Sequence, residues 1–336
     1  HWYSIKKRDL PWRNTKDPYK IWLSEIILQQ TRVAQGLPYY ERFVQQYPQI
    51  QDLASAPQDD VMRTWQGLGY YSRARNLHKA AKVVAKEMGG KFPSSYDGLL
   101  ALPGVGPYTA AAIASIAFGV PSPVLDGNVY RVIARVFAMA HDISASSSRK
   151  HFLDILDELI SPDHPDAFNQ GMMELGATVC SPKNPSCELC PVEDHCLARA
   201  AGDQLKYPVK TKKVKVRTRP FHYLVIAHEG HVAMKQRVGN DIWQGLYEFM
   251  LVESSSFQLD DYLHPNTTHT LEVSEVYRHI LTHQRIEARF YRADVTDKNV
   301  FDDLLNKYEL KAYSFHQILT LPKPKLMVNY LEHQIF

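Results

Sequence analysis

Apolar side chains recur every three or four positions along the first half of the chain, which is the spacing of helices that bury one face. Pairs that end helices, such as Asp17-Pro18 and Gly89-Gly90, separate these segments. The first half is therefore predicted to be mainly helical. The predicted helices are Lys20–Ala34, Asp60–Trp65, Ser72–Met88, Tyr108–Ala117, Val129–Met139 and Arg149–Ile160.

The pattern changes in the second half of the chain. His222–His228 and His231–Lys235 alternate between apolar and polar positions on either side of Glu229-Gly230, which predicts a β-hairpin. Glu287–Tyr291 predicts a further strand, whereas Phe301–Lys307 has helical spacing. The second half is therefore predicted to be an α+β domain.

This change divides the chain into domains, and a length of 336 residues also favours two of them. We expect a helical domain at 1–202, a linker at 203–220 and a second domain at 221–336. Because the chain opens with His1 rather than methionine, we also expect residues to precede it.

Charge is concentrated in the linker rather than spread over the chain. The net charge is only +3, so composition alone does not indicate a nucleic-acid partner. Leu205–Arg219, however, contains seven Lys or Arg residues and no acid. Such a run is typical of a solvated linker, and it would also gain from neutralising phosphates along a polyanion.

All four cysteines fall within one short stretch, with the spacing C-x6-C-x2-C-x5-C. This arrangement predicts a metal site rather than a disulfide framework, since the chain is long and we expect no signal peptide. Four thiolates suit either Zn²⁺ or an iron–sulfur cluster, and the single C-x2-C pair favours the cluster. The predicted ligands are Cys180, Cys187, Cys190 and Cys196.

A glycine-rich turn joins two of the predicted helices at Leu102–Ala110. Gly104 and Gly106 allow close approach of another backbone, and Pro107 suits the first turn of the next helix. The amides at that helix start could hold a phosphate. A Gly-x-Gly sequence between helices is, however, more often only a turn.

Two carboxylates have the surroundings that glycosidic bond cleavage requires. Glu25 shares a predicted helix face with apolar residues, so burial would favour its protonated form, although a glutamate there more often points to solvent. Asp126 precedes a predicted helix at Val129, where it would act as an N-cap and stay ionised near the helix dipole. A neutral acid can protonate a leaving group, while a charged one stabilises the sugar cation.

Several long strings resemble MutY-type adenine DNA glycosylases of the endonuclease III superfamily. They are LSEIILQQT, GLGYYSRARNLHKAA, LPGVGPYTA, LDGNVYRV and FNQGMMELGATVC, followed by the four cysteines in register. The resemblance implies a helix-hairpin-helix glycosylase domain with a [4Fe–4S] cluster loop at 180–196, followed by an α+β Nudix-like domain.

The resemblance also implies roles for individual residues. Glu25 would protonate adenine, Asp126 would stabilise or trap the sugar cation, and Tyr108 and Asn128 would support that chemistry. Arg13 would line the adenine pocket. Positions that match those facing the lesion strand are Gln30, Thr31, Leu68 and Tyr70, with Tyr70 as a wedge in the base stack.

Two other functions compete with adenine removal. Endonuclease III is a lyase on oxidised pyrimidines, and its hairpin carries a nucleophilic lysine where this chain has Tyr108. A catalytically silent iron–sulfur DNA-binding protein is the other, but such a protein has no need for both Glu25 and Asp126. The residues therefore favour a monofunctional glycosylase.

The second domain resembles the Nudix-like domain of the same enzymes through Trp243–Phe249. It has no glutamate cluster of the kind that a Nudix hydrolase needs for metal, so nucleotide hydrolysis is not expected. Where the family has Phe-Ser-His for recognising 8-oxoguanine, this chain has Leu281, Thr282 and His283. The implied partner is double-stranded DNA with an A:8-oxoguanine or A:G mispair, bound by a monomer in the bacterial cytoplasm, without membrane association.

Overall fold

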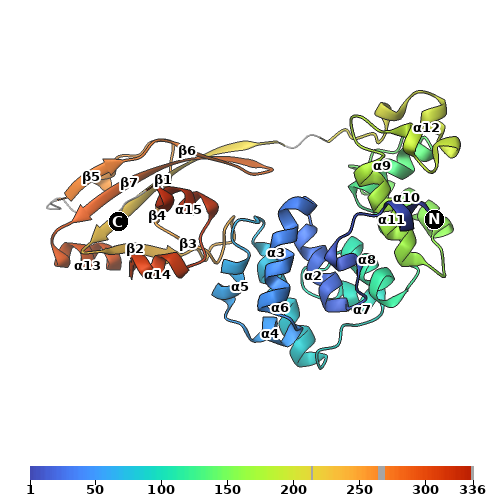
Figure 1. The fold of residues 1–336 in the computed structure, drawn as a ribbon. Coiled ribbons are helices and arrows are strands. Elements are labelled where there is room, and N and C mark those ends of the chain that lie inside the picture. The colour runs from blue at the N-terminus through green and yellow to red at the C-terminus, as the bar shows by residue number, and fades with distance from the viewer. Residues whose placement is uncertain (213–214, 264–268, 334–336) are drawn as a thin grey trace. The chain divides into compact units, whose positions relative to one another are not determined.

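The computed structural model describes residues 1–212, 215–263 and 269–333, and it divides the chain into two compact units (Figure 1). The first unit contains 1–55 and 76–212, and the second contains 56–75 together with the chain from 213 onward. The second unit is therefore discontinuous in sequence. The expected boundaries at 202 and 221 assign residues 56–75 to the helical domain instead.

Helices form the regular structure of the described part of the first unit. The α-helices are α1 (Trp2–Lys6), α2 (Pro18–Leu28), α3 (Val33–Gln46), α4 (Ile50–Ser55), most of α6 (Ser72–Glu87), α7 (Tyr96–Leu100), α8 (Pro107–Phe118), α9 (Gly127–Val136), α10 (Ser148–Leu159), α11 (Pro165–Thr178) and α12 (Leu197–Ala200). The short 3₁₀ turns are η1 (Pro11–Arg13), η2 (Cys187–Leu189), η3 (Glu193–His195) and η4 (Gln204–Lys206).

One predicted helix extends beyond the helix that the structure has there, and most of α3 lies outside the predicted bounds. The sequence predicts a continuous helix at Lys20–Ala34, but α2 ends at Leu28 and α3 begins at Val33. Gln30, between them, has a positive φ of 53°, which a helix cannot contain. The chain therefore turns at the residues that were expected to face DNA.

Helix α8 lies at the centre of the first unit. It contacts α2, α7 and α11, and its residues Thr109–Ile116 are all buried. Small side chains, four of them alanine, let the neighbouring helices approach closely. This packing places the start of α8 beside α2 and α11, where the candidate site lies.

A mixed sheet forms the main part of the second unit, which also contains α5 (Gln58–Thr64). Within the described residues, the strand order is β3-β2-β1-β7-β5, with β4 paired to β1, β6 to β7 and β8 to β2. Only β1 and β7 run parallel among these pairs. The strands are β1 (Arg217–His228), β2 (His231–Gln236), β3 (Tyr247–Glu248), β4 (Met250–Glu253), β5 (His269–Val273), β6 (Tyr277–Ile280), β7 (Gln284–Val295) and β8 (Lys311–Ser314), with η5 at Leu259–Asp261.

Helices cover both faces of this sheet. Neighbouring residues of a strand point to opposite faces, and Leu224 packs with Phe301 of α13 (Lys298–Lys307). Tyr223 instead stacks on Phe290, which stacks on Tyr330 of α15 (Lys325–Glu332) at 4.0 Å between ring centroids. The short helix α14 (Phe315–Thr320) follows β8. The predicted α+β second half is thus confirmed, as is the helical first half.

The expected linker at 203–220 is partly structured. Arg135 of α9 donates hydrogen bonds to the carbonyl oxygens of Gln204 and Tyr207, so the start of this segment packs on the first unit. Its end belongs to β1, which begins at Arg217. Residues 213–214 lie outside the described part of the chain.

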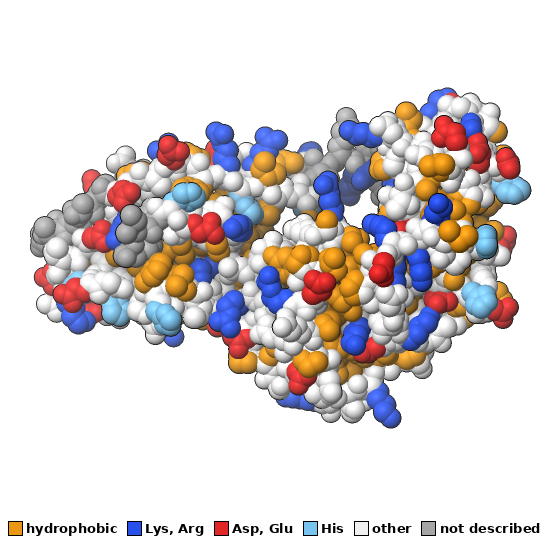
Figure 2. Space-filling model, viewed as in Figure 1, with side chains coloured by type: hydrophobic (Ala, Val, Ile, Leu, Met, Phe, Trp, Pro, Cys, Tyr) orange, Lys and Arg blue, Asp and Glu red, His pale blue; other side chains and the backbone are white. Residues whose placement is uncertain are grey.

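Positive and negative side chains are interspersed on the visible face of both units (Figure 2). This mixture agrees with the small net charge of +3. In the part of the chain that the structure describes, no helix is both long and apolar enough to cross a membrane.

Candidate active site

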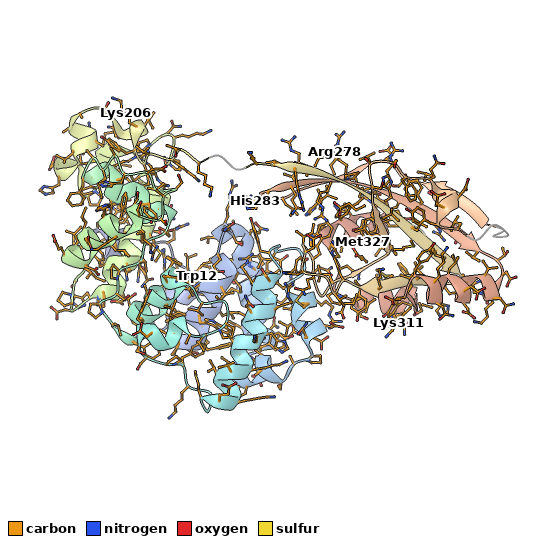
Figure 3. All side chains as sticks on the ribbon, turned by 180° about the vertical axis from the view of Figure 1, so that it is seen from behind. Trp12, Lys206, Arg278, His283, Lys311 and Met327 are labelled. Carbon is orange, nitrogen blue, oxygen red and sulfur yellow. The ribbon has the colours of Figure 1, made fainter. Side chains whose placement is uncertain are left out.

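A pocket of about 420 Å³ in the first unit gathers residues that lie far apart in the sequence. Trp12, labelled in Figure 3, forms part of its wall. An adjoining hollow shares several of these residues and is also lined by Gln30 and Gly106. The pocket of about 420 Å³ is lined by the residues that the sequence predicts for chemistry or for the base pocket, together with Thr31. These predicted residues are Arg13, Glu25, Tyr108, Asp126 and Asn128.

The local sequence explains how Glu25 comes to be buried. Helix α2 starts with Asp17 as an N-cap, whose side chain accepts a hydrogen bond from the amide of Tyr19, and with Pro18 at the first helical position. One turn before Glu25, Ile21 and Trp22 are fully buried. Glu25 itself is 9% exposed, so it lies on the face that α2 turns to the interior.

Burial determines the ionisation of Glu25. Removal from water raises the pKa of this carboxyl group to about 7, and the nearby negative charge of Asp126 acts in the same direction. A hydrogen bond with Tyr108 and the positive charge of Arg13 oppose the rise. A substantial fraction of Glu25 is therefore protonated near neutral pH, as its apolar neighbours in the sequence predict.

Asp126 caps helix α9, as predicted. Its Oδ1 accepts hydrogen bonds from the amides of Asn128 and Val129 at 2.9 and 2.8 Å, and its Oδ2 accepts one from Asn128 Nδ2 at 2.9 Å. Burial nevertheless raises the pKa of Asp126, although these donors and the charge of Arg131 act to lower it. The helix start therefore compensates the buried charge without producing the low pKa of an exposed N-cap.

Asn128 is held in turn by Arg131, a residue that sequence reasoning missed. Arg131 donates to Asn128 Oδ1 at 2.9 Å and to the carbonyl oxygens of Gly176 and Cys180, each at 2.7 Å. Position 176 has no room for a side chain, because a Cβ at Gly176 would lie 2.6 Å from the Cβ of Asn128. The spacing of three residues between Asn128 and Arg131 was the available signal, since it places both on one helix face.

Glu174 of α11 also lines the pocket and was not predicted. Its carboxylate accepts hydrogen bonds from Arg8 and from Arg13, and its side chain has no exposed surface. Nearby, Gln170 accepts a hydrogen bond from Tyr3 at 2.9 Å. The sequence signal was a set of polar residues within an otherwise helical apolar pattern, which alone does not reveal their partners.

The turn between α7 and α8 has the predicted helix-hairpin-helix form, and its two glycines differ. Gly104 has a φ of 77°, and a Cβ there would lie 2.6 Å from the Cβ of Asn76. Gly106, the N-cap of α8, has no atom within 4 Å of such a Cβ and is followed by Pro107. Gly104 is thus required by packing, whereas Gly106 faces open space at a helix start.

A separate pocket in the second unit contains residues assigned to the lesion strand. Tyr70, with a φ of 48° and 45% of its surface exposed, forms a hydrogen bond with Thr282. Leu281 and His283 line the same pocket, in the turn between β6 and β7, and Figure 3 labels His283 there. Leu68 is only 5% exposed, so the structure places it in the interior rather than beside Tyr70 on the surface.

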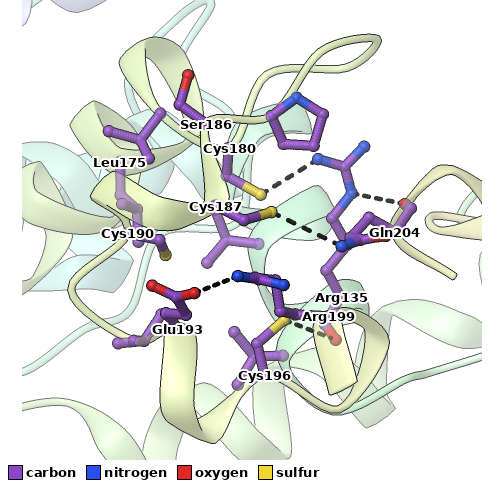
Figure 4. Close-up of a pocket in the computed structure, with 15 residues that line it drawn as sticks. Arg135, Leu175, Cys180, Ser186, Cys187, Cys190, Glu193, Cys196, Arg199 and Gln204 are labelled. Carbon is purple, nitrogen blue, oxygen red and sulfur yellow. Dashed lines mark hydrogen bonds and ion pairs between the residues drawn. The ribbon is translucent and has the colours of Figure 1, made fainter. Parts of the chain in front are cut away.

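The four cysteines surround one pocket at the end of the first unit, with their sulfur atoms directed into it (Figure 4). Among the described residues, no three His, Cys, Asp or Glu side chains converge to hold a single metal ion. Four thiols that line one pocket are a donor set of the kind that binds iron–sulfur clusters.

Arg135 supports an anionic group at this place. It is 2% exposed, donates to Cys180 Sγ at 3.3 Å and otherwise donates to carbonyl oxygens. Within the described residues it forms no ion pair with a carboxylate. Since a buried cation is costly without a compensating anion, Arg135 would suit an anionic group bound between the cysteines. Gln204 donates to a second sulfur, that of Cys187, at 3.8 Å.

Each half of the sequence matches a known protein family. Residues 23–158 match the family described as HhH-GPD superfamily base excision DNA repair protein, and residues 222–333 match the NUDIX domain family. The two matches correspond to the helical half and to the sheet-containing half.

The chain is also similar to individual proteins named adenine DNA glycosylase. The adenine DNA glycosylase of Buchnera aphidicola subsp. Schizaphis graminum is 38% identical over 251 residues, which cover 74% of this chain and 72% of that protein. The adenine DNA glycosylase of Mus musculus is 48% identical over 206 residues, which cover 59% of this chain and 40% of that protein.

Solved structures support the fold of the helical half. A thermostable thymine-DNA glycosylase is 31% identical with a TM-score of 0.55, and the match covers 60% of this chain and 92% of that one. Endonuclease III in a non-covalent DNA complex has a TM-score of 0.51 at 23% identity, and this likeness concerns the fold alone. The chain therefore belongs to the adenine DNA glycosylase family, and it is a base excision repair glycosylase that acts on adenine.

Proposed function

We propose that this protein hydrolyses the N-glycosidic bond of adenine paired with 8-oxoguanine or guanine in double-stranded DNA, as a monomer and without cutting the strand. The observation that carries the proposal is a pair of unlike carboxyl groups in one pocket. Glu25 has a pKa of about 7, whereas the carboxylate of Asp126 accepts three hydrogen bonds. This pair supplies an acid and an anion near neutral pH.

In the proposed reaction, Glu25 donates its proton to the adenine ring, and the bond between that ring and the sugar carbon breaks. Asp126 then stabilises the positive charge that develops on the sugar, or forms a bond to it. Water then adds to the sugar carbon, displaces the Asp126 carboxylate where that bond has formed, and gives up a proton to the ionised Glu25, which leaves an abasic site. Asn128 holds Asp126 through a hydrogen bond, Tyr108 lines the pocket with Glu25 and acts to lower its pKa, and Arg13 lines the space for the base.

The lining of the pocket favours a monofunctional enzyme. A lyase needs an amine that attacks the sugar carbon and forms a Schiff base. None of the residues that line the pocket around Glu25 is a lysine, and the hairpin position carries Tyr108. Phenols do not form Schiff bases, so we infer that strand cleavage is not part of the reaction.

The remaining assignments concern DNA. We propose that Gly104, Gly106 and the amides of the hairpin hold a phosphate, because this turn presents a helix start to open space. Gln30 and Thr31, at the break between α2 and α3, line the hollow beside it. Flipping of adenine into the pocket would leave these residues next to the gap in the duplex.

The second unit is proposed to recognise the base opposite adenine. Exposed Tyr70 and Thr282 meet in a pocket that His283 also lines, and hydroxyl groups can hydrogen-bond to a base edge. A residue that is exposed and has a positive φ is often retained for function, since the conformation itself is unfavourable. Leu68 is buried, so we assign it no direct contact with the base.

The cysteine-lined pocket is proposed to hold a [4Fe–4S] cluster through Cys180, Cys187, Cys190 and Cys196. Such a cluster supplies redox-capable iron and cross-links its loop. All four thiols would be its ligands, and Arg135 and Gln204 donate toward two of the sulfurs. We therefore infer a structural role for the loop rather than a part in base release.

The test is single-turnover base release from a duplex with one adenine opposite 8-oxoguanine, analysed with and without alkali. Strand breaks that appear only after alkali would support a monofunctional adenine glycosylase. Breaks without alkali would mean a lyase and a nucleophile outside this pocket. If protein with four irons per chain gave no breaks under either condition, the mispair assignment would be wrong, and oxidised pyrimidines would be the next substrates to examine.

A further inference from the structure

Glu174 is the buried carboxylate of the pocket that the proposed reaction leaves without a role. It lies on α11, and its side chain has no exposed surface. Oε1 accepts hydrogen bonds from the amide and Nε of Arg8 at 3.0 and 2.8 Å. Oε2 accepts one from an NH2 group of each of Arg8 and Arg13, both at 2.7 Å.

This carboxylate fixes two guanidinium groups at opposite ends of a short turn. Arg8 precedes η1 and Arg13 ends it, and Arg13 also donates to the carbonyl oxygen of Arg8 at 3.1 Å. The Arg8 side chain is 41% exposed, whereas that of Arg13 is 8% exposed. Glu174 therefore attaches the N-terminal segment to α11 and determines where the buried charge of Arg13 lies.

The ionisation of Glu174 does not change in the working pH range. Burial acts to raise the pKa of this carboxyl group, but hydrogen bonds from Arg8 and Arg13 outweigh burial and lower the pKa to about 2. Glu174 is thus an anion at every pH at which the protein would act. It differs in this from Glu25, whose pKa is about 7.

Arg13 pairs with Glu174 and lines the same pocket as Glu25. Its charge already acts to lower the pKa of Glu25. A direct ion pair lowers the pKa of a carboxyl group by roughly 1–3 units, which would leave Glu25 ionised at neutral pH and unable to donate a proton. The charged and titratable groups around Glu25 in this pocket are Arg8, Arg13, Arg32, Tyr108, Asp126 and Glu174.

We propose that Glu174 is a positioning residue, which holds the guanidinium groups of Arg8 and Arg13 on the pocket wall and prevents Arg13 from pairing with Glu25. The inference rests on the proposed role of Glu25 as the acid. In the absence of the Glu174 anion, Glu25 is the carboxyl group in the pocket with the fewest donors, because Asp126 already accepts three hydrogen bonds. Arg13 would then move toward Glu25.

The test compares the parent protein with Glu174→Gln, which keeps the shape of the side chain and removes its charge. The first measurement is the pKa of Glu25 by carbon-13 NMR of labelled glutamate, with Glu25→Gln used to assign the signal. We expect this pKa to fall by at least about one unit in Glu174→Gln. The second measurement is single-turnover base release from the A:8-oxoguanine duplex between pH 5.5 and 8.5. One pKa unit corresponds to a rate about tenfold lower at pH 8, with a much smaller loss at pH 5.5.

A matched control is available on the same helix. Asp166→Asn removes an acid of α11 that pairs with Lys16 near the surface and does not line the pocket. We expect both the Glu25 pKa and the pH–rate profile of this variant to match the parent.

Two results would overturn the proposal. One is an unchanged Glu25 pKa in Glu174→Gln, and the other is a loss of rate by the same factor at every pH, as a purely structural role predicts. If Glu174→Gln does not fold, Glu174→Asp keeps the charge but withdraws it by one methylene, and it should lower the Glu25 pKa by a smaller amount. The NMR titration needs no substrate, so it distinguishes failure of this inference from failure of the proposed mispair specificity.

Discussion

Glu25 and Asp126 line the same pocket, yet the groups that contact each carboxyl group differ. Asp126 sits at a helix start, so two backbone amides and the Asn128 side chain point at its oxygens. Glu25 sits in the middle of α2, where the backbone amides are already used within the helix. The hydroxyl group of Tyr108, which donates to Met173 Sδ at 3.1 Å, also acts on Glu25 and opposes the effect of burial on its pKa. Position within a helix thus decides which of the two acids is protonated more readily.

The unusual state of Glu25 has a consequence for stability. Below about pH 4.5 this group is protonated in both the folded and the unfolded chain, so it adds no pH dependence. Between about pH 4.5 and pH 7 the unfolded chain releases this proton while the folded chain keeps it, so the folded state becomes relatively less stable. Above pH 7 the group is ionised in both states, and the loss of stability is complete. The shift from 4.5 to about 7 corresponds to about 3 kcal/mol in the free energy of unfolding above pH 7.

We therefore predict that Glu25→Gln abolishes base release but stabilises the protein more at pH 8 than at pH 5. The measurement is denaturant unfolding of both proteins at the two pH values. Glutamine changes local hydrogen bonds at both pH values, so the difference between them isolates ionisation. Equal effects of the substitution at pH 5 and pH 8 would contradict a raised pKa for Glu25.

At the scale of elements, the hairpin between α7 and α8 combines one glycine required for folding with one that leaves space. Gly104 adopts a left-handed conformation against Asn76. Gly106 has an ordinary φ of −95° and no neighbour that a methyl group would meet. The protein's own packing therefore does not require a glycine at this position, and the missing side chain leaves room for a DNA phosphate to approach the amides of the turn.

The two glycines allow a matched pair of substitutions. We predict that Gly104→Ala destabilises the fold by at least about 1–2 kcal/mol, because both the positive φ and the contact with Asn76 are unfavourable. Gly106→Ala should keep the parent's melting temperature and weaken DNA binding, since its methyl group would stand where a phosphate approaches the amides. Thermal melts and DNA titrations at one salt concentration measure both effects. Parent-like affinity in Gly106→Ala would show that this turn does not hold a phosphate.

Elements with a regular apolar face were predicted well from the sequence. Predicted and observed bounds agree within two residues for α6, α8 and α10, and the β1–β2 hairpin turns at the expected Glu229-Gly230. The end of α2 was missed although Gln29–Arg32 are all polar, because the apolar positions resume at Val33 and Ala34. The positive φ of Gln30, which the apolar pattern does not indicate, ends the helix. Helix α11 was missed for a different reason, since its buried residues include polar Asn169 and Glu174.

The candidate site shows the same division. Glu25 and Asp126 could be singled out because their local surroundings in the sequence are unusual for carboxylates. Glu174, Arg131 and Arg135 could not, because what distinguishes them is a partner far along the chain. Arg8 and Glu174, for example, are separated by 166 residues. Tertiary contacts between such distant residues do not appear in the periodic pattern of apolar and polar positions.

In the whole molecule, the two compact units are not two consecutive halves of the sequence. The second unit takes in residues 56–75 from the helical half of the sequence. Arg75 donates to the carbonyl oxygen of Gln244 at 2.6 Å, and Gln66 accepts a hydrogen bond from the amide of Lys323 at 2.9 Å. The connection between the two halves of the sequence therefore does not depend on the linker alone.

A cut in the linker tests this arrangement. We predict that a protease site inserted between Lys212 and Lys215 gives two fragments that still elute together in gel filtration at micromolar concentration. The reason is that the second unit can keep its segment 56–75, in which Met62 and Trp65 are fully buried. Denaturant should separate the fragments, and the uncut protein at the same concentration is the control. Separation without denaturant would mean that residues 56–75 belong with the helical unit and that the linker alone joins the two halves.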